Sequence, residues 1–326
     1  MTSASPARSA SDHLAELAHA MLRPGAEITM HSDDFLQVGL HTPGAVVLRH
    51  TEQVRELLEQ LRVGASPIEL GPDTAPAWQR LAEADLLVDA DAYFNRLPVD
   101  EAARSSRSAV YADHTLSAPA LLRNRSELAV AVDADALGDE ALGDEARRLL
   151  SLAGVSLTGP PAVRLVIADR ELSRARLDRA MQASLPHLVV RSTEGRVVLG
   201  PFVVPGVTAC LRCVDLHHSE SEPRRPLIIE QYAAAADSTT VARPVDHARL
   251  GLATAWAVID VLAYLDGEQP TTWSSTLTVD AARRFTPQRW PRHPHCGCSW
   301  TGGWADTHTS VPSVEASIEP PGVEAG

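Results

Sequence analysis

Four cysteines are the residues of this chain whose type and spacing point most directly to chemistry. Two residues separate Cys210 from Cys213, and Gly297 alone separates Cys296 from Cys298. Tetrahedral Zn²⁺ takes four thiolates from two such short segments, and glycine lets the backbone bend tightly between two ligands. Because four thiolates leave no coordination position for water, we predict a structural zinc ion. Four ordinary thiols, or a redox-active Cys-x-x-Cys, are the alternatives.

Other residues capable of chemistry follow the first cysteine pair: Asp215, His217 and His218, with Ser219 and Glu220 nearby. They could form a hydrolase triad, but the sequence contains no Gly-x-Ser-x-Gly turn, which argues against that reading. His293 and His295 flank the second pair. Both are spare candidate ligands, although surface positions are the simpler interpretation.

Composition restricts the classes of protein to which the chain can belong. It has 326 residues and a net charge of −13, so a nucleic-acid partner is not expected. Residues 1–21 lack the continuous apolar run of a secretory signal. The longest apolar stretch, 252–265, contains Asp260 and is too short to cross a bilayer, so no membrane partner is expected. We predict a cytoplasmic protein, in which cysteine pairs indicate metal rather than disulfides.

The first third of the chain predicts a small domain. Residues 1–20 are expected to be a mobile arm that ends in a short helical turn. Short strands are predicted over 26–31, 35–40, 45–49 and 86–88, with helices beginning after Thr51 and Thr74. Three strands followed by helices indicate a winged-helix-like domain over residues 21–92.

The rest of the chain predicts an α/β fold. Residues 93–126 are expected to be an irregular connector, and 301–326 a disordered tail rich in Pro, Gly, Ser and Glu. Between them, strands are predicted over 128–132, 163–168, 188–191, 197–199 and 274–280, and helices over 142–152, 174–183 and 247–264. Alternating strands and helices indicate a parallel sheet in a Rossmann-like domain over residues 127–300.

The cysteine segments resemble those of a known family. Gly-Pro-Phe-Val-Val-Pro-Gly at 200–206 leads into Cys210 and Cys213, and Pro-His-Cys-Gly-Cys ends at Cys298. This arrangement is similar to the ThiF/MoeB-like proteins of azole- and azoline-containing peptide biosynthesis, the cyclodehydratase C-protein and ocin-ThiF-like group. The resemblance runs from roughly residue 21 to 300. It implies a PqqD-like leader-recognition element followed by an adenylating fold with a structural zinc site.

The resemblance also exposes a departure from active relatives, which begin the adenylating fold with a strand and a Gly-x-Gly-x-x-Gly turn. Asp133 and Asp135 occupy the first two glycine positions here, and only Gly138 matches. Carboxylates repel a triphosphate, and their Cβ atoms obstruct its approach to the backbone. We therefore expect that ATP binding is lost and that the chain is a non-catalytic subunit.

In the resembled proteins the leader of a ribosomal precursor peptide lies along the third strand and packs on a helix. The matching residues here are Val46, Val47, Leu48, Arg49, Trp78, Leu81 and Asp85. Arg49, Arg55 and Arg80 are candidates to pair with leader carboxylates. The resemblance implies that the leader is presented to a YcaO-type cyclodehydratase, which forms azolines from Cys, Ser or Thr, and that two copies can pair as a homodimer.

Two other functions compete with that of a leader-binding adaptor. One is an active adenylating enzyme that acts on a peptide or carrier C-terminus, which the degenerate glycine turn disfavours. The other is a winged-helix DNA-binding regulator, which the net charge of −13 disfavours.

Overall fold

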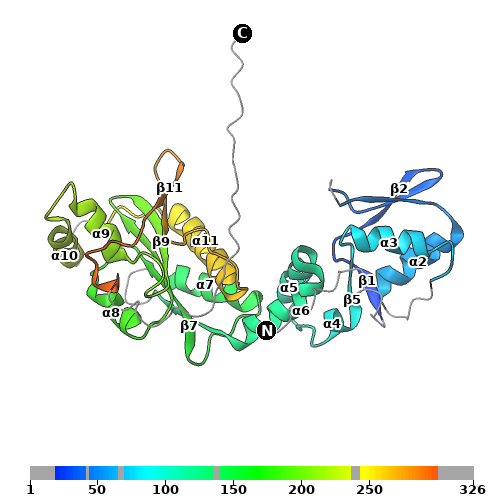
Figure 1. The fold of residues 1–326 in the computed structure, drawn as a ribbon, viewed down its shortest axis with the longest axis horizontal. Helices are drawn as coiled ribbons and strands as arrows, with labels where there is room; N and C mark the ends of the chain where they lie inside the picture. The colour runs from blue at the N-terminus through cyan, green and yellow to red at the C-terminus, as the bar shows by residue number, and fades with distance from the viewer. Residues whose placement is uncertain (1–18, 42–43, 65–69, 135–139, 236–242, 300–326) are drawn as a thin grey trace, which may run out of the picture.

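The computed structural model describes residues 19–41, 44–64, 70–134, 140–235 and 243–299. Two groups of elements lie at opposite ends of an elongated molecule, with helices between them (Figure 1). The predicted tail at 301–326 and nearly all of the predicted arm at 1–20 fall outside the described residues.

The N-terminal group contains two small sheets and two helices. Strands β2 (Ile28–Ser32), β3 (Phe35–Val38) and β4 (Val46–Arg49) form an antiparallel sheet in the order β2-β3-β4. Strands β1 (Ala20–Leu22) and β5 (Leu87–Asp89) form a separate antiparallel pair. Helices α2 (Glu52–Val63) and α3 (Ala75–Glu83) complete the group. Since β4 is the last strand of its sheet, one of its edges pairs with no described strand.

Local sequence explains helix α2 in full. The Thr51 hydroxyl accepts a hydrogen bond from the Val54 amide at 3.2 Å and caps its N-terminus. Gly64 ends the helix in the left-handed conformation, with φ of 65°. Apolar residues at helical spacing enter the N-terminal core: Val54, Leu57, Leu58 and Leu61.

The connector is helical, so the prediction of irregular structure over 93–126 was wrong. It begins at the end of α4 (Ala90–Phe94) and continues with α5 (Glu101–His114) and α6 (Ala118–Glu127). Helix α5 buries only Val110 and Tyr111, so it lacks the apolar stripe that periodicity detects. The sequence feature that indicates the start of α5 is its N-cap residue Asp100, whose side chain accepts a hydrogen bond from the Ala103 amide at 2.8 Å.

The start of the N-terminal group also differs from expectation. Ala20 lies in strand β1, not in a helical turn that ends the arm. Met21 of this strand joins a small apolar cluster with Val110 and Tyr111 of the connector. At the other end of the connector, Arg125 donates to a buried carboxylate oxygen of Asp266 at 2.8 Å. The helices are therefore fixed to both groups of elements.

The C-terminal group is built on a six-stranded sheet in the order β11-β10-β9-β8-β7-β6. Its strands are β6 (Ala129–Asp133), β7 (Pro161–Ala168), β8 (His187–Thr193), β9 (Arg196–Val203), β10 (Ser275–Val279) and β11 (Phe285–Arg289). Strands β6, β7 and β8 are parallel to one another, whereas β9, β10 and β11 pair antiparallel. The expected all-parallel sheet is thus a mixed one, because a tight turn at Glu194-Gly195 joins β8 to β9 as a hairpin.

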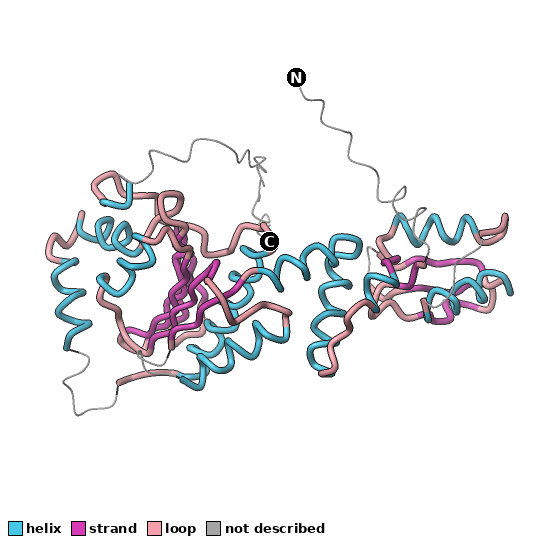
Figure 2. Tube along the Cα trace, turned by 90° about the horizontal axis from the view of Figure 1, so that it is seen from below, coloured by secondary structure: helices cyan, strands magenta, loops and turns pink. Residues whose placement is uncertain are grey.

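Helices cover both faces of the large sheet (Figure 2). Along β8, Leu188 and Val190 enter the core shared with α7 (Glu140–Leu152) and α11 (His247–Leu265), whereas Val189 enters the cluster that includes Leu177 of α8 (Ala175–Gln182). Burial on both faces explains why the central strands are continuous apolar runs rather than alternating ones.

Helix α11 is longer than the apolar stretch considered in the sequence. Its 19 residues are long and apolar enough to cross a membrane by length and composition, contrary to the expectation that the stretch is too short. In the fold one face of α11 packs on the sheet in the C-terminal core. Asp260, buried in this helix, accepts the amides of Thr271 at 3.0 Å and Thr272 at 2.9 Å. This carboxylate therefore ties α11 to the loop that precedes β10.

Candidate functional site

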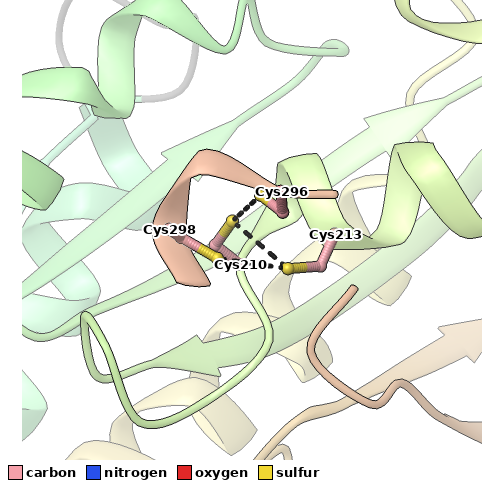
Figure 3. Close-up of side chains that lie close together, drawn as sticks. All are labelled: Cys210, Cys213, Cys296 and Cys298. Carbon is pink, nitrogen blue, oxygen red and sulfur yellow. Dashed lines mark hydrogen bonds between the residues drawn. The ribbon is translucent and has the colours of Figure 1, made fainter. Parts of the chain in front are cut away.

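The fold brings the two cysteine pairs together. Cys210 is the N-cap of α9 (Leu211–Ser219), and Cys213 lies in the first turn of this helix. Cys296 and Cys298 come from the segment that follows β11 (Figure 3). All four side chains are buried, and none forms a disulfide.

The sulfur positions fit a tetrathiolate zinc site. The Sγ atom of Cys210 lies 3.8 Å from that of Cys213 and 3.7 Å from that of Cys296. The Sγ atoms of Cys213 and Cys298 are 3.3 Å apart. Zn–S bonds of about 2.3 Å in a tetrahedron require sulfur–sulfur edges of about 3.8 Å. These three sulfur–sulfur distances thus lie within about 0.5 Å of the edges of a Zn²⁺ tetrathiolate.

The cluster favours loss of protons from two of its thiols. A hydrogen bond from the Cys210 thiol lowers the pKa of Cys213 and lowers that of Cys298 to about 7, whereas hydrogen bonds to the other thiols raise the pKa values of Cys210 and Cys296. Apolar side chains of Val203, Ala209 and Trp290 surround the sulfurs. Thiolates are the ligand form that zinc requires, and the apolar surroundings shield them from water. A zinc ion here would fix the segment after β11 to α9.

A buried ionic cluster lies next to the cysteines. Arg174 donates from Nε and Nη2 to the two carboxylate oxygens of Asp215, at 2.6 and 2.9 Å. Its Nη1 donates to Glu171 at 2.6 Å, and Arg191 donates from Nε to the other oxygen of Glu171 at 3.2 Å. Two arginines therefore neutralise two carboxylates, and the cluster links the start of α8 to α9.

Sequence reasoning missed this cluster and considered Asp215 only as a member of a hydrolase triad, which it disfavoured. The structure pairs Asp215 with Arg174 instead of with a histidine. One signal was available: Glu171 and Arg174 are charged residues three positions apart in a segment next to a buried strand. Charged residues in such a place are usually paired with each other.

The buried ionic cluster should make the free energy of unfolding depend on pH in the acid range. Burial alone would raise the pKa of Glu171, but the guanidinium groups of Arg191 and Arg174 hold it at about 2, below the ordinary 4.5. A lowered pKa stabilises the fold above pH 4.5, and that stability is lost as pH falls toward 2. We expect this loss to be about 3 kcal/mol in the wild type. The free energy of unfolding, measured against urea from pH 5 to 2.5, should fall less steeply in Glu171→Gln. Glu52→Gln, at an exposed position, should behave as the wild type.

Strand β6, which precedes the degenerate glycine turn, is the last named strand of the large sheet. Asp133 ends β6, and its carboxylate accepts a hydrogen bond from Arg164 at 2.6 Å. Both residues line a cavity of about 560 Å³, together with Arg176 and Arg179 of α8. On the side of β6 away from β7, the Val130 amide donates to the Ser156 carbonyl at 2.9 Å in a parallel bridge, so the order of the chain reverses at β6, as it does where Rossmann folds open a nucleotide crevice. Asp135 and Gly138 lie outside the described residues.

The residues matched to the leader-binding surface divide into two sets. Val46, Leu48 and Leu81 are buried in the N-terminal core, so their side chains do not face solvent. Val47, Arg49, Trp78 and Asp85 are partly or fully exposed. Trp78 also packs against the core. The alternation along β4 is that of a strand with one covered face.

The backbone N–H groups of β4 also alternate: those of every second residue face β3, and the others face the open edge. The His50 amide donates to the Asp34 carbonyl at 2.8 Å, so Val46, Leu48 and His50 pair with β3. The N–H groups of Val47 and Arg49 consequently point away from β3. Arg80 of α3 donates from Nη1 to the Val47 carbonyl at 2.6 Å. The open edge therefore offers backbone donors next to an arginine.

Several solved structures share this fold. The fold is similar to that of the heterocyclase TruD. That likeness has a TM-score of 0.62 at 17% identity and covers 86% of this chain and 42% of TruD. A heterocyclase in complex with substrate and cofactor has a TM-score of 0.60 at 16% identity, and the likeness covers 86% of this chain and 39% of that one. MccB of E. coli has a TM-score of 0.53 at 14% identity, and the likeness covers 86% of this chain and 96% of MccB.

These comparisons establish the fold, a mixed α/β architecture with a Rossmann-like sheet. The chain spans less than half the length of the two heterocyclases but nearly the full length of MccB. No protein-family model matches the sequence, and no curated protein matches it.

Proposed function

We propose that this protein binds the leader of a ribosomally made precursor peptide as an added strand on β4. The observation that carries the proposal is the open edge of β4, where the N–H groups of Val47 and Arg49 point away from β3. Main-chain hydrogen bonds to such an edge give affinity, and side-chain contacts give selectivity. Arg49 of β4 and Arg80, which donates to the Val47 carbonyl, are exposed at this edge and suit a leader that carries carboxylates. Arg55 of α2 is also exposed, but it pairs with Glu52 of the same helix.

The remaining parts serve this role as recognition element and scaffold. Residues 21–92 act as a PqqD-like, winged-helix-like recognition domain, and 127–300 act as a ThiF-like scaffold held by a structural zinc ion. The bound peptide is presented to a YcaO-type cyclodehydratase, which forms the azolines. Likeness to heterocyclases, one of them solved with its substrate, supports this class of pathway.

Loss of nucleotide binding is supported by Asp133 at the end of β6, a position where active members of the resembled family have glycine. The Asp133 carboxylate is directed at the cavity that a triphosphate would enter, and it neutralises Arg164 there. The competing function is an adenylating enzyme, since MccB, solved with ATP, has a similar fold. A DNA-binding regulator is opposed by the net charge of −13 and by α3, whose sequence contains one basic residue, Arg80.

Val47→Pro tests the edge-strand mode. Proline removes the outward N–H, and edge strands tolerate proline because that N–H forms no ladder bond. We expect the affinity for the leader of a precursor encoded beside this gene to fall about tenfold or more, measured by calorimetry with a synthetic leader peptide.

Val47→Thr is the matched control, because it keeps both the N–H and the β-branched shape and should bind as the wild type. Equal melting temperatures of the two variants verify the fold. Equal affinity of Val47→Pro and wild type contradicts the proposed mode. A titration with ATP and Mg²⁺ separates the adaptor from the enzyme, since saturation at micromolar ATP supports the enzyme.

A second copy of this chain is a further proposed partner. Leu252 and Ile259 of α11 and Phe285 of β11 are 47%, 61% and 45% exposed. Trp256 contacts Phe285, with 5.9 Å between ring centroids, and lies one helical turn from each of the two α11 residues. This apolar stripe supports pairing of two copies through α11.

A further inference from the structure

A second group of metal-binding side chains lies beside the cysteines. His217 of α9, Glu220 at the end of this helix and His293 of the segment after β11 hold their ligand atoms within 4.8 Å of one another. His217 is one helical turn after Cys213, and His293 is three residues before Cys296. The two segments that supply the thiolates therefore supply these three residues as well.

The distances suit a shared cation better than hydrogen bonds. Oε1 of Glu220 lies 3.5 Å from Nδ1 of His217 and 3.5 Å from Nε2 of His293. Hydrogen bonds between such atoms are 2.7–3.2 Å long. Tetrahedral Zn²⁺ with bonds of about 2.0–2.1 Å to nitrogen and oxygen requires ligand–ligand edges of about 3.4 Å. Oε1 of Glu220 thus lies about as far from each ring nitrogen as two ligands of one zinc ion lie from each other.

The His217 ring is already oriented for ligation. Its Nε2 lies 2.9 Å from the Pro291 carbonyl oxygen, to which it donates. That bond places the proton on Nε2 and leaves the Nδ1 lone pair facing Glu220. Metal-bound histidines characteristically donate their second ring N–H to a carbonyl in this way. The ring also stacks on Trp290, with 6.0 Å between centroids, and this contact restricts its rotation.

The His293 ring must exchange a proton to bind. Its Nδ1 accepts the His295 amide at 3.2 Å, which places the ring proton on Nε2. Ligation through Nε2 moves that proton to Nδ1 and breaks this hydrogen bond, at a cost of about 1 kcal/mol. His293 is buried, whereas the Glu220 side chain is 68% exposed. Binding is therefore weaker than at the thiolates, and the cation is reached from solvent.

We propose that His217, Glu220 and His293 form a second, exchangeable site for a divalent transition-metal ion, Zn²⁺ foremost. Two imidazoles and a carboxylate are the donors that borderline cations such as Zn²⁺ and Co²⁺ prefer. Three protein ligands leave one coordination position for water or an incoming ligand, unlike the closed thiolate site. The proposal does not depend on leader binding.

Metal titration of the full, untagged chain tests the site. We expect two equivalents of zinc at saturation, and one after dialysis against a mild chelator, measured by mass spectrometry of the metal content. In a protein whose thiolate site is filled with zinc, added Co²⁺ should give the weak visible bands of a nitrogen- and oxygen-ligated ion without thiolate charge transfer.

Glu220→Gln and His217→Gln should each lose the second equivalent and keep the first. Glu220 is exposed, so its variant should fold, and retention of the first equivalent verifies this. His218→Gln is the matched control and should keep both equivalents, because His218 neighbours His217 but is not one of the three ligands. A single equivalent in the wild type at saturation overturns the proposal, as does a second equivalent that persists in both variants.

Discussion

Replacing Cys213 by serine is expected to lower the stability of the C-terminal group more than any exposed substitution. Cys213 is buried, and its sulfur is 3.3 Å from that of Cys298. Serine is a poor ligand for zinc and leaves a hydroxyl in apolar surroundings. Free energy of metal binding is folding free energy at such sites, about 10–16 kcal/mol in small zinc domains. We expect a loss of at least ~4 kcal/mol, or a fall in Tm of roughly 10 °C, measured by calorimetry.

Arg212→Ala is the matched control, because Arg212 lies between the two cysteines but is exposed and pairs only at the surface with Asp178. It should change stability by less than about 1 kcal/mol. If Cys213→Ser fails to fold, removal of metal from the wild type with a strong chelator gives the same information. Equal Tm values with and without metal contradict a structural zinc ion.

Replacing Arg174 by methionine is expected to cost about 3–5 kcal/mol of folding free energy. Methionine keeps much of the volume but leaves the Asp215 and Glu171 carboxylates with one buried guanidinium, that of Arg191. The cost in folding free energy is large because removing one partner of a buried ionic cluster leaves a buried charge without compensation. Unfolding in urea, followed by circular dichroism, measures the loss.

A charge-balanced double variant tests the electrostatic cause. Arg174→Met with Asp215→Asn restores neutrality, because Glu171 then pairs with Arg191 alone. It should recover more than half of the lost stability. Arg284→Met, which removes an exposed pair with Asp280, should cost less than about 1 kcal/mol. A double variant no more stable than the single one contradicts the electrostatic explanation.

Elements with strong local signals were predictable from the sequence. Thr51 and the apolar face that follows it located α2 correctly, and the buried apolar runs located β7 and β8. The cysteines also meet as expected, because their spacing alone supplies two ligand pairs. In each case the information lies within one turn or one strand, where neighbouring residues determine the conformation.

Features that depend on distant partners were not predictable. Helix α5 has only Val110 and Tyr111 to bury, and its stability comes from packing on other elements. Strand β11 is exposed along its whole length and exists because it pairs with β10. The ionic cluster joins Arg174 to Asp215 across 41 positions of sequence. Long-range pairing of this kind is a property of the tertiary fold.

The helical connector has a consequence for the length of any substrate held on β4. Helix α5 has 14 residues, so it is about 21 Å long, and it lies between β4 and the large sheet (Figure 1). A leader held on β4 as proposed must therefore be followed by a spacer that passes this helix, and an extended peptide needs about six residues to run its length. We expect a precursor with a shorter spacer between its anchored part and its first modified side chain to be a poor substrate.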